Sequence, residues 1–276
     1  MDRARDTQRG GRFVGRTAIV TGASSGIGLA VARRLDSEGA LLTLVAAPQD
    51  AAELKRVALD LGGTDRPVQT LAADIGEQAT ADQAVEAALG QWGRLDLLVS
   101  NAGIARFGEI LHTPIEDLDV QLRVNVRGMF LMVLAAARAM AREGGGRIVC
   151  TCSSSGTLGD AYQAPYNMSK AAVAQLVRSF AVDLAPHGVR VNGVAPGWTR
   201  TAATQALLDD PAAWAKHRTR VPLDRPADPE EVAGVATFLL SDDATYMTGA
   251  VVPVDGGLTA GIRLSGWDPV IQDAAI

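Results

Sequence analysis

The amino-acid sequence predicts an α/β fold, a doubly wound parallel sheet of about seven strands with helices on both faces, in a single domain. Seven short apolar runs alternate with helical segments along the chain. Apolar strands that alternate with helices are typical of a parallel sheet that is covered on both faces. The chain has 276 residues, enough for one such domain with a sizeable core, and it shows no internal repeat or linker.

The expected elements follow one another from residue 17 to residue 257. Strands are expected at 17–22, 41–47, 67–74, 95–103, 146–154, 189–197 and 250–257, and helices at 28–39, 50–62, 79–91, 115–140, 166–186 and 229–241. The segment 198–225 interrupts this order because it is longer, irregular and rich in Thr, Asp and Arg. Its length predicts an active-site lid rather than a connector. Ligands of such a sheet bind beyond the carboxyl ends of its strands.

Composition and charge narrow the class of protein. The net charge of −5 argues against a nucleic-acid partner or an anionic membrane surface. No uninterrupted apolar run approaches the roughly 18 residues that a membrane span needs. The polar residues 1–12 are expected to form a flexible arm, and no secretory signal is recognised there. Cys150 and Cys152 are interpreted as buried strand thiols, which favours the cytoplasm, and no metal site is expected.

A glycine-rich turn joins the first strand to the first helix. In "TGASSGIG" (21–28), Gly22 permits a sharp turn, Gly26 lets backbone amides approach a pyrophosphate, and Gly28 lets the helix pack closely on the sheet. In such sites an acid at the end of the second strand binds the adenosine ribose of NAD, or an arginine nearby accommodates the 2′-phosphate of NADP. Ala46 and Ala47 stand there instead. A dinucleotide site is therefore predicted, and the two alanines do not select between NAD and NADP. The absence of a basic residue in this loop and between Ala23 and Ser25 gives a slight preference for NAD.

Asp50 follows that strand end at a distance of a few residues. It has two interpretations, a ribose ligand or a cap of the next helix, and we favour the cap.

The helix expected at 166–186 carries an unusual polar pair on its inward face. Tyr166 and Lys170 are spaced i, i+4 and therefore share a face. Val177 lies almost two turns beyond Lys170 on the apolar stripe, so the ammonium group is expected to be buried. Burying a lysine is costly unless it is paired or used. A cation one turn away favours the phenolate form of a tyrosine, which suits proton transfer near neutral pH.

Several motifs together resemble the short-chain dehydrogenase/reductase family, and within it the 3-oxoacyl-carrier-protein-reductase-like group. They are "TGASSGIG", Asp74, "NAG" (101–103), Asn125 in "VNVRG", Ser153, "YNMSK" (166–170), "PGWTRT" (196–201) and "VDGG" (254–257). They occur in the family's order and spacing from about residue 13 to residue 260. The resemblance implies a Rossmann fold over 13–260, with 261–276 as a C-terminal tail outside the shared pattern.

The resemblance also implies an activity, the hydride transfer that interconverts a secondary alcohol and a ketone with NAD or NADP. By this resemblance, Tyr166 is the acid/base, Lys170 binds the nicotinamide ribose and favours the phenolate, Ser153 holds the substrate oxygen, and Asn125 anchors a proton-relaying water. The cofactor-binding residues that it implies are Gly22, Ser24, Ser25, Gly26, Ile27, Gly28, Asp74, Ile75, Asn101, Ala102, Gly103, Tyr166, Lys170, Pro196, Gly197, Thr199 and Thr201.

Two other functions stay open at this point. One is a dinucleotide-binding regulator or scaffold without turnover, which would tolerate the loss of one of the four candidate catalytic residues, whereas none is lost. The other is dehydration or epimerisation on the same cofactor, which would show no net cofactor turnover. The expected substrate is a small, neutral, fairly apolar carbonyl compound or alcohol. Its pocket is expected to be built from Ser155, Asp160, Tyr162, Gln163, Trp198 and the lid residues 201–220.

Two helices carry more apolar surface than one subunit needs. The helix 166–184 has Ala171, Ala172, Ala174 and Ala181 beyond its core stripe, and "FLMVLAAARAM" (130–140) shows the same excess. Another protein surface is therefore expected to cover them, and the family resemblance implies a dimer or a tetramer built from these helices. A homotetramer is predicted, with a dimer as the alternative, and 251–276 could supply a second interface.

Overall fold

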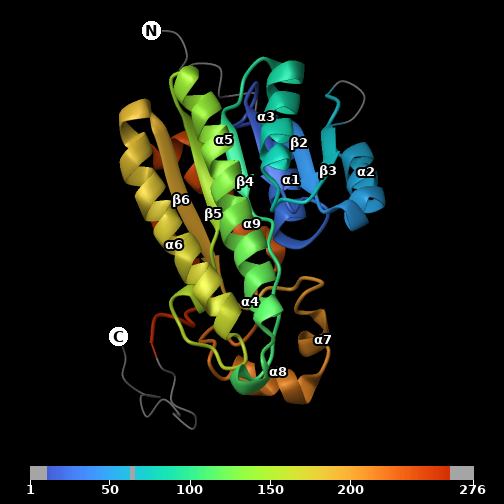
Figure 1. Cartoon of the computed structure of the whole chain (residues 1–276), viewed down its shortest axis with the longest axis vertical. Helices are drawn as coiled ribbons and strands as arrows, with labels where there is room; N and C mark the ends of the chain where they lie inside the picture. Colours follow the sequence, from blue (N-terminus) through green and yellow to red (C-terminus); the bar gives the residue numbers. More distant parts are fainter. Residues whose placement is uncertain (1–10, 63–65, 262–276) are drawn as a thin grey trace, which may run out of the picture.

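The structure of the protein, a computed structural model, describes residues 11–62 and 66–261. Seven parallel strands form one sheet in the order β3-β2-β1-β4-β5-β6-β7 (Figure 1). The predicted doubly wound parallel sheet in a single domain is thereby confirmed. The strands are β1 (Thr17–Thr21), β2 (Leu41–Ala46), β3 (Gln69–Ala72), β4 (Leu97–Ser100), β5 (Gly146–Thr151), β6 (Val189–Pro196) and β7 (Val251–Val254).

Helices cover both faces of this sheet. The helices are α1 (Gly26–Ser37), α2 (Ala51–Asp60), α3 (Gln78–Trp92), α4 (Ile115–Gln121), α5 (Met129–Arg142), α6 (Ala164–Leu184), α7 (Gln205–Leu208), α8 (Pro211–Arg218) and α9 (Pro229–Leu240). Helices α3, α5 and α6 pack on one face, and α1, α2 and α9 pack on the other. Helices α7 and α8 lie beyond the end of the sheet (Figure 1).

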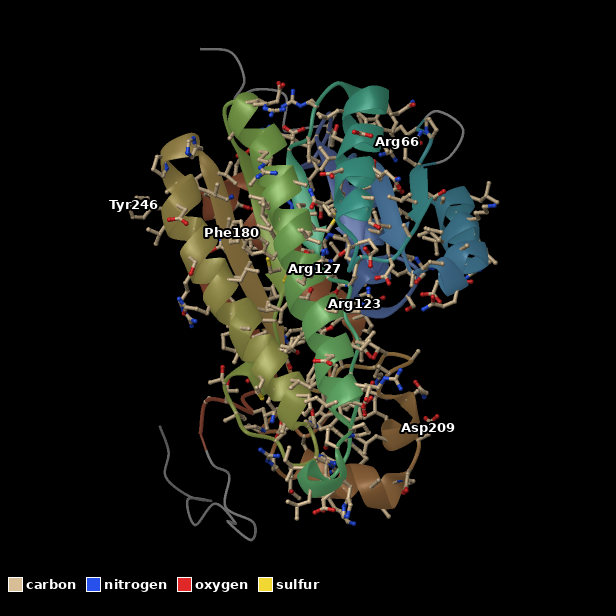
Figure 2. All side chains as sticks on the ribbon, viewed as in Figure 1. Arg66, Arg123, Arg127, Phe180, Asp209 and Tyr246 are labelled. Carbon is tan, nitrogen blue, oxygen red and sulfur yellow. The ribbon has the colours of Figure 1, made fainter. Side chains whose placement is uncertain are left out.

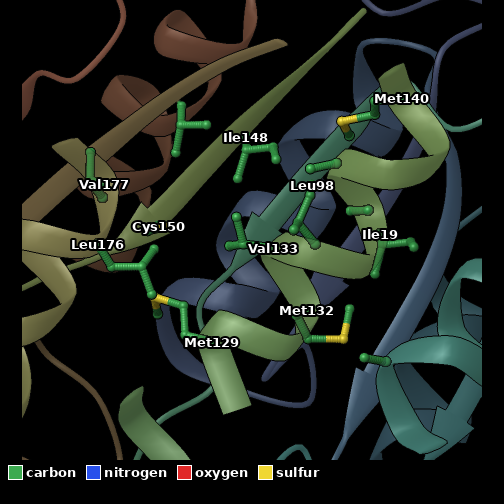
Figure 3. Packing of buried hydrophobic residues seen from close by; sticks show 14 of the residues in the cluster. Ile19, Leu98, Met129, Met132, Val133, Met140, Ile148, Cys150, Leu176 and Val177 are labelled. Atoms are coloured by element: carbon green, nitrogen blue, oxygen red, sulfur yellow. The ribbon is translucent and has the colours of Figure 1, made fainter. Parts of the chain in front are cut away.

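Alternate side chains of the strands build two separate cores. Ile19 of β1 enters the core beneath α3, α5 and α6, whereas its neighbours Ala18 and Val20 enter the core beneath α1 and α9. Figure 3 shows the first core, where Met129 of α5 lies among side chains from β5 and α6. This burial on both faces explains why the strands are apolar at consecutive positions.

The expected helix 115–140 has a different internal geometry. It runs without a break from Ile115 to Arg142, but Leu122–Gly128 is π-helical. A Cβ atom on Gly128 would lie 2.9 Å from the carbonyl oxygen of Ile75, so the helix passes close to the loop after β3. Asn125 lies in this π-helical segment and is fully buried. A π-helical turn inside an α-helix often marks a functional site.

The same helix is long and apolar enough, by these two criteria alone, to cross a membrane. Its most apolar window has a mean hydropathy of 1.4, and half of that window is buried inside this protein. A core helix of a folded domain passes the same test, and α5 is such a helix because it packs on the sheet.

The segment 198–225 is more regular than expected, because it contains α7 and α8. The side chain of Asp210 caps α8 by accepting hydrogen bonds from the amides of Ala212 and Ala213 at 2.9 and 3.1 Å. Arg218 then pairs with Asp224 inside the segment.

The structure confirms the expectation for the two cysteines and describes only part of the expected arm and tail. Cys150 and Cys152 are buried free thiols, as expected, and burial raises the pKa of Cys152 to about 11. Of the expected N-terminal arm, residues 1–10 lie outside the described residues, and Arg12 pairs with Glu38. Residues 262–276 of the expected tail also lie outside them.

Candidate active site

A cleft of about 620 Å³ opens at the carboxyl ends of the strands. It lies where the strand order reverses between β1 and β4, the place where doubly wound sheets bind ligands. All of the residues predicted for the cofactor and for catalysis line it, except Gly28 and Asn125. Side chains that are far apart in the sequence are therefore brought together as predicted.

The glycine turn has the geometry that a pyrophosphate requires. Gly22 and Gly26 have φ angles of +64° and +54°, a region that favours glycine. A Cβ atom on Gly28 would lie 2.1 Å from the carbonyl oxygen of Gly22, so Gly28 is required for packing, outside the cleft lining. The Ser25 side chain forms no capping hydrogen bond with α1. The amides of the first turn of α1 therefore keep hydrogen-bonding capacity for an anion.

Hydrogen bonds hold this turn to the neighbouring strand ends. The Asn101 side chain donates to the carbonyl oxygen of Thr21 at 3.1 Å and accepts from the Thr151 hydroxyl at 3.0 Å. The Thr21 hydroxyl in turn accepts from the amides of Asn101 and Ala102, at 2.9 and 3.0 Å. Asn101 thus connects the carboxyl ends of β1, β4 and β5 beneath the cleft.

Lys170 is buried, as its place on the apolar stripe predicts. Only 4 % of the residue is exposed, and its ammonium group donates to the carbonyl oxygen of Thr151 at 2.9 Å. It lies 5.7 Å from the centre of the Tyr166 ring, one helical turn away. A Cβ atom on Gly103 would lie 3.1 Å from the side-chain oxygen of Asn125 and 3.6 Å from the ammonium nitrogen, so the loop after β4 passes close to both side chains. The ammonium group therefore sits in the cleft with a single fixed partner among the described residues.

Ser153 follows β5 at the same edge of the sheet. Its hydroxyl accepts a hydrogen bond from the amide of Ser155 at 3.1 Å, which fixes the side chain at the start of a single 3₁₀ turn. The side chains of Ser153 and Tyr166 both line the cleft, although thirteen residues separate them in the sequence.

Asn125 has a different environment from the other candidates. Its amide group exchanges hydrogen bonds with the backbone of Ile104, at 2.8 and 2.9 Å, and also donates to the Ser169 hydroxyl at 3.0 Å. The side chain therefore holds the loop after β4 against α6. The predicted anchoring of a water by Asn125 stays a prediction.

The part of the cleft that is predicted to bind adenosine contains an ion pair that the sequence did not reveal. Arg123 donates to the Asp74 carboxylate at 2.9 Å, and the amide of Gly76 donates to the same carboxylate at 2.8 Å. Burial acts to raise the pKa of Asp74, but these two hydrogen bonds outweigh it and lower that pKa below its ordinary value. Figure 2 shows Arg123 on the helix that runs from Ile115 to Arg142. The pair spans 49 residues, so no local pattern predicts it.

The interpretation of Asp50 as a helix cap is wrong. Asp50 stands at the N-cap position of α2, but its side chain forms no capping hydrogen bond. The preceding 3₁₀ turn, Pro48–Asp50, carries it into the cleft lining. Its carboxylate lies 3.5 Å from the hydroxyl of Ser24 in the glycine turn.

The predicted substrate pocket differs from the lining of the cleft at Tyr162 and over lid residues 205–220, none of which line it. Ser155, Asp160, Gln163 and Trp198 line the cleft, as do lid residues 201–204. Tyr162 does not line it; this residue has a positive φ of 62° and is 66 % exposed. Phe107, which the sequence analysis did not single out, takes a place there and packs edge-on against the Tyr166 ring at 6.4 Å.

Trp198 lines the cleft and also packs against the lid. Its ring lies 6.2 Å from the ring of Trp214 and 4.6 Å from that of His217, both in α8. The lid is therefore packed on an aromatic residue that also faces the site.

Comparisons with known proteins agree with this geometry. The family model described as enoyl-(acyl carrier protein) reductase matches residues 22–259. The oxidoreductase UcpA of Salmonella typhimurium is 37 % identical over 256 residues, which cover 90 % of this chain and 96 % of that protein. L-rhamnose 1-dehydrogenase (NAD(P)(+)) of a Sphingomonas species is 37 % identical over 250 residues, covering 90 % and 98 %.

A solved structure shows the same arrangement with a nucleotide. A short-chain dehydrogenase from Burkholderia cenocepacia in complex with NADP has a TM-score of 0.83 and 33 % identity, covering 90 % of this chain and 99 % of that one. The glycine turn, the uncapped start of α1 and the ammonium group of Lys170 in the cleft fit a nicotinamide dinucleotide. The chain belongs to the short-chain dehydrogenase/reductase family, in its 3-oxoacyl-carrier-protein-reductase-like group, and is an NAD(P)-dependent oxidoreductase that interconverts a secondary alcohol and a ketone.

Proposed function

We propose that Tyr166 carries the alcohol proton in this reaction, with Lys170 and Ser153 as its partners. The single observation that supports this assignment is that the three side chains line one cleft, with Lys170 buried one turn from Tyr166. A nicotinamide dinucleotide, when bound, supplies the hydride acceptor or donor. During oxidation Tyr166 takes the proton of the substrate hydroxyl, and during reduction it returns that proton.

Lys170 and Ser153 have different roles beside Tyr166. Lys170 stabilises the phenolate through its charge and holds the nicotinamide ribose. The ammonium group has one fixed acceptor, Thr151, so it can donate to further oxygen atoms. Ser153, whose hydroxyl already accepts from Ser155, donates its own proton to the substrate oxygen.

The experiment that tests this function is a panel of secondary alcohols and ketones with both cofactors, followed by the absorbance of the reduced nicotinamide. Turnover with either cofactor supports an alcohol/ketone oxidoreductase. Conversion of a substrate without net change in the cofactor would favour a dehydratase or epimerase on the same fold, and cofactor binding with no conversion at all would favour a scaffold.

We infer a small neutral substrate and a cytoplasmic enzyme. Within residues 11–62 and 66–261, no arginine lines the substrate end of the cleft to recognise a phosphate or a carboxylate, and Lys170 is assigned to the cofactor side. The two buried free thiols suit a reducing compartment. The segment 198–225 acts as the lid, since its residues 201–204 close one side of the cleft.

The first prediction concerns cofactor preference. The charged residues at the adenosine end, within the described part of the chain, are Asp50, Asp74 and Arg123, and the arginine is already paired with Asp74. We expect NAD to be preferred over NADP by less than about tenfold, because no acid at Ala46 or Ala47 repels the 2′-phosphate strongly. The measurement is kcat/KM for both cofactors with one substrate. A strong preference for NADP would contradict it and would implicate a basic residue outside this set.

The second prediction concerns assembly, for which we propose a homotetramer with a dimer as the alternative. The outer surface of α5 and α6 carries an aromatic pair, Phe130 and Phe180, whose ring centres are 5.2 Å apart. Phe180 is seen on α6 beside α5 in Figure 2. Ala174 and Ala181, by contrast, are buried in the subunit's own core, so their expected place beyond the core stripe is wrong. A substitution at Ala174 would therefore test folding rather than assembly.

Phe130→Arg is the better test, because 45 % of Phe130 is exposed and the subunit does not need it for its core. We expect this variant to lower the mass measured by light scattering behind a sizing column. Leu59→Arg on α2, a helix on the far side of the sheet, replaces a residue that is 84 % exposed and should leave the mass unchanged. A wild-type mass of 28.7 kDa, that of one chain, would contradict the proposal.

A further inference from the structure

A buried carboxylate at the substrate end of the cleft has no part in the chemistry described above. Asp160 lies in the loop between β5 and α6, and only 9 % of its side chain is exposed. One carboxylate oxygen accepts from the Ser155 hydroxyl at 3.1 Å, and the other accepts from the Arg220 guanidinium at 2.9 Å. Its backbone carbonyl accepts from the Asn167 side chain of α6 at 2.9 Å. The carboxylate is thus fixed from three elements while it lines the cleft.

The chemistry of a fixed carboxylate restricts what can bind beside it. An ionised carboxylate only accepts hydrogen bonds, and its two oxygens have about four lone-pair sites. Ser155 and Arg220 fill one site on each oxygen, so capacity remains for a donor inside the cleft. An apolar group placed there would remove water from the carboxylate without replacing its hydrogen bonds, which is unfavourable. A hydroxyl group is a neutral donor that meets this requirement.

Asp160 is also close to the place where the substrate reacts. The amide of Ser155 donates to the Ser153 hydroxyl at 3.1 Å, and the hydroxyl of the same Ser155 donates to Asp160. One residue therefore separates the proposed holder of the reacting oxygen from the carboxylate. A single small molecule can reach both groups if it carries a second hydroxyl near the reacting carbon.

We propose that Asp160 determines substrate specificity by accepting a hydrogen bond from a second hydroxyl of the substrate. The substrate class is then a neutral diol or hydroxyketone with the second hydroxyl near the reacting carbon, cyclic polyols included. Phe107 and Trp198 supply aromatic surface in the same cleft against which the carbon skeleton packs. The inference rests on the proposed function, because it places the reacting oxygen at Ser153 and Tyr166. It replaces the expectation of a fairly apolar substrate.

Arg220 is a positioning residue in this proposal. It comes from the end of the lid and holds Asp160 without lining the cleft itself. The alternative explanation is that the Arg220–Asp160 pair only fastens the lid. That explanation predicts equal effects on every substrate, whereas an acceptor for a second hydroxyl affects diols selectively.

The experiment compares kcat/KM for cyclohexanol with kcat/KM for its vicinal diols, in the wild type and in variants. We expect the wild type to prefer at least one diol by about tenfold or more, the effect of one hydrogen bond to a charged group. Asp160→Ala should bring this ratio close to one while changing cyclohexanol turnover far less. Asp160→Asn keeps the volume of the side chain and should lower the ratio in the same direction.

Arg218→Ala is the matched control, because it removes a second lid ion pair, with Asp224, that does not touch the cleft. Its diol preference should equal that of the wild type. Unchanged NADH affinity, measured by fluorescence titration, shows that each variant is folded around its cofactor site.

Two outcomes would overturn the inference and leave the proposed function standing. One is wild-type turnover of cyclohexanol at least equal to that of its diols. The other is a diol preference that Asp160→Ala does not change. That result would mean that the Arg220–Asp160 ion pair only holds the lid in place. The absence of turnover with every alcohol and ketone of the panel would instead overturn the proposed function, and the inference with it.

Discussion

Tyr166→Phe is expected to lower kcat by at least about a hundredfold, the lower end of the effect of a positioned general acid or base. The substitution removes only the phenol oxygen, which is the group proposed to exchange a proton with the substrate. The ring remains, so its edge-on contact with Phe107 and its place over Lys170 are kept. Cofactor affinity should therefore change little, and kcat and kcat/KM should be measured together with the Kd of NADH.

Tyr162→Phe provides the matched control, since it removes a phenol oxygen four residues away in the same segment. Tyr162 is exposed and does not line the cleft. Its variant should have wild-type kcat. If Tyr166→Phe also kept near wild-type kcat, the assignment of Tyr166 as the acid/base would be wrong.

The fold was predictable because its signals are local and repeated. Each strand is a short apolar run, and a side chain such as Ile19 or its neighbour Val20 meets an apolar core whichever face it points to. The strand order and the division of the helices between the two faces depend on contacts across the whole chain. The π-helical turn at Asn125 was not predictable either, since it arises where the helix passes Ile75.

The candidate site was predictable where one residue type is required at one position. Gly28 is an example, because any side chain there would collide with the carbonyl oxygen of Gly22. Lys170 is another, because its helical position alone places a charge in the core. Arg123 and Phe107 were missed, since each acts through a partner that is distant in the sequence.

Errors arose where two local interpretations compete. Asp50 has the sequence position of a helix cap, and only the 3₁₀ turn before it shows that its carboxylate points to the cleft. Ala174 is small enough for either face of α6, and its place in the core depends on how the helix is rotated on the sheet. Helical periodicity does not fix that rotation to within one residue.

Lys170→Met is expected to weaken cofactor binding and to lower kcat. Methionine keeps most of the length and apolar volume of the lysine stem, so the variant removes the charge without opening a large cavity. The carbonyl oxygen of Thr151 loses its donor, but the cost of burying an ammonium group is also removed, so the fold should persist. The effect on function is larger because the same ammonium group serves both the ribose and Tyr166.

The pH dependence separates this role from a structural one. Without the cation, the phenolate of Tyr166 is less stable, so any residual alcohol oxidation should reach its plateau at higher pH than in the wild type. A lysine that only fills space would leave the shape of the pH profile unchanged. Lys216→Met, on the exposed surface of α8, is the control and should leave both the profile and the Kd of NADH as in the wild type. An unchanged Kd of NADH in Lys170→Met, measured by fluorescence titration, would show that the buried ammonium group does not hold the cofactor.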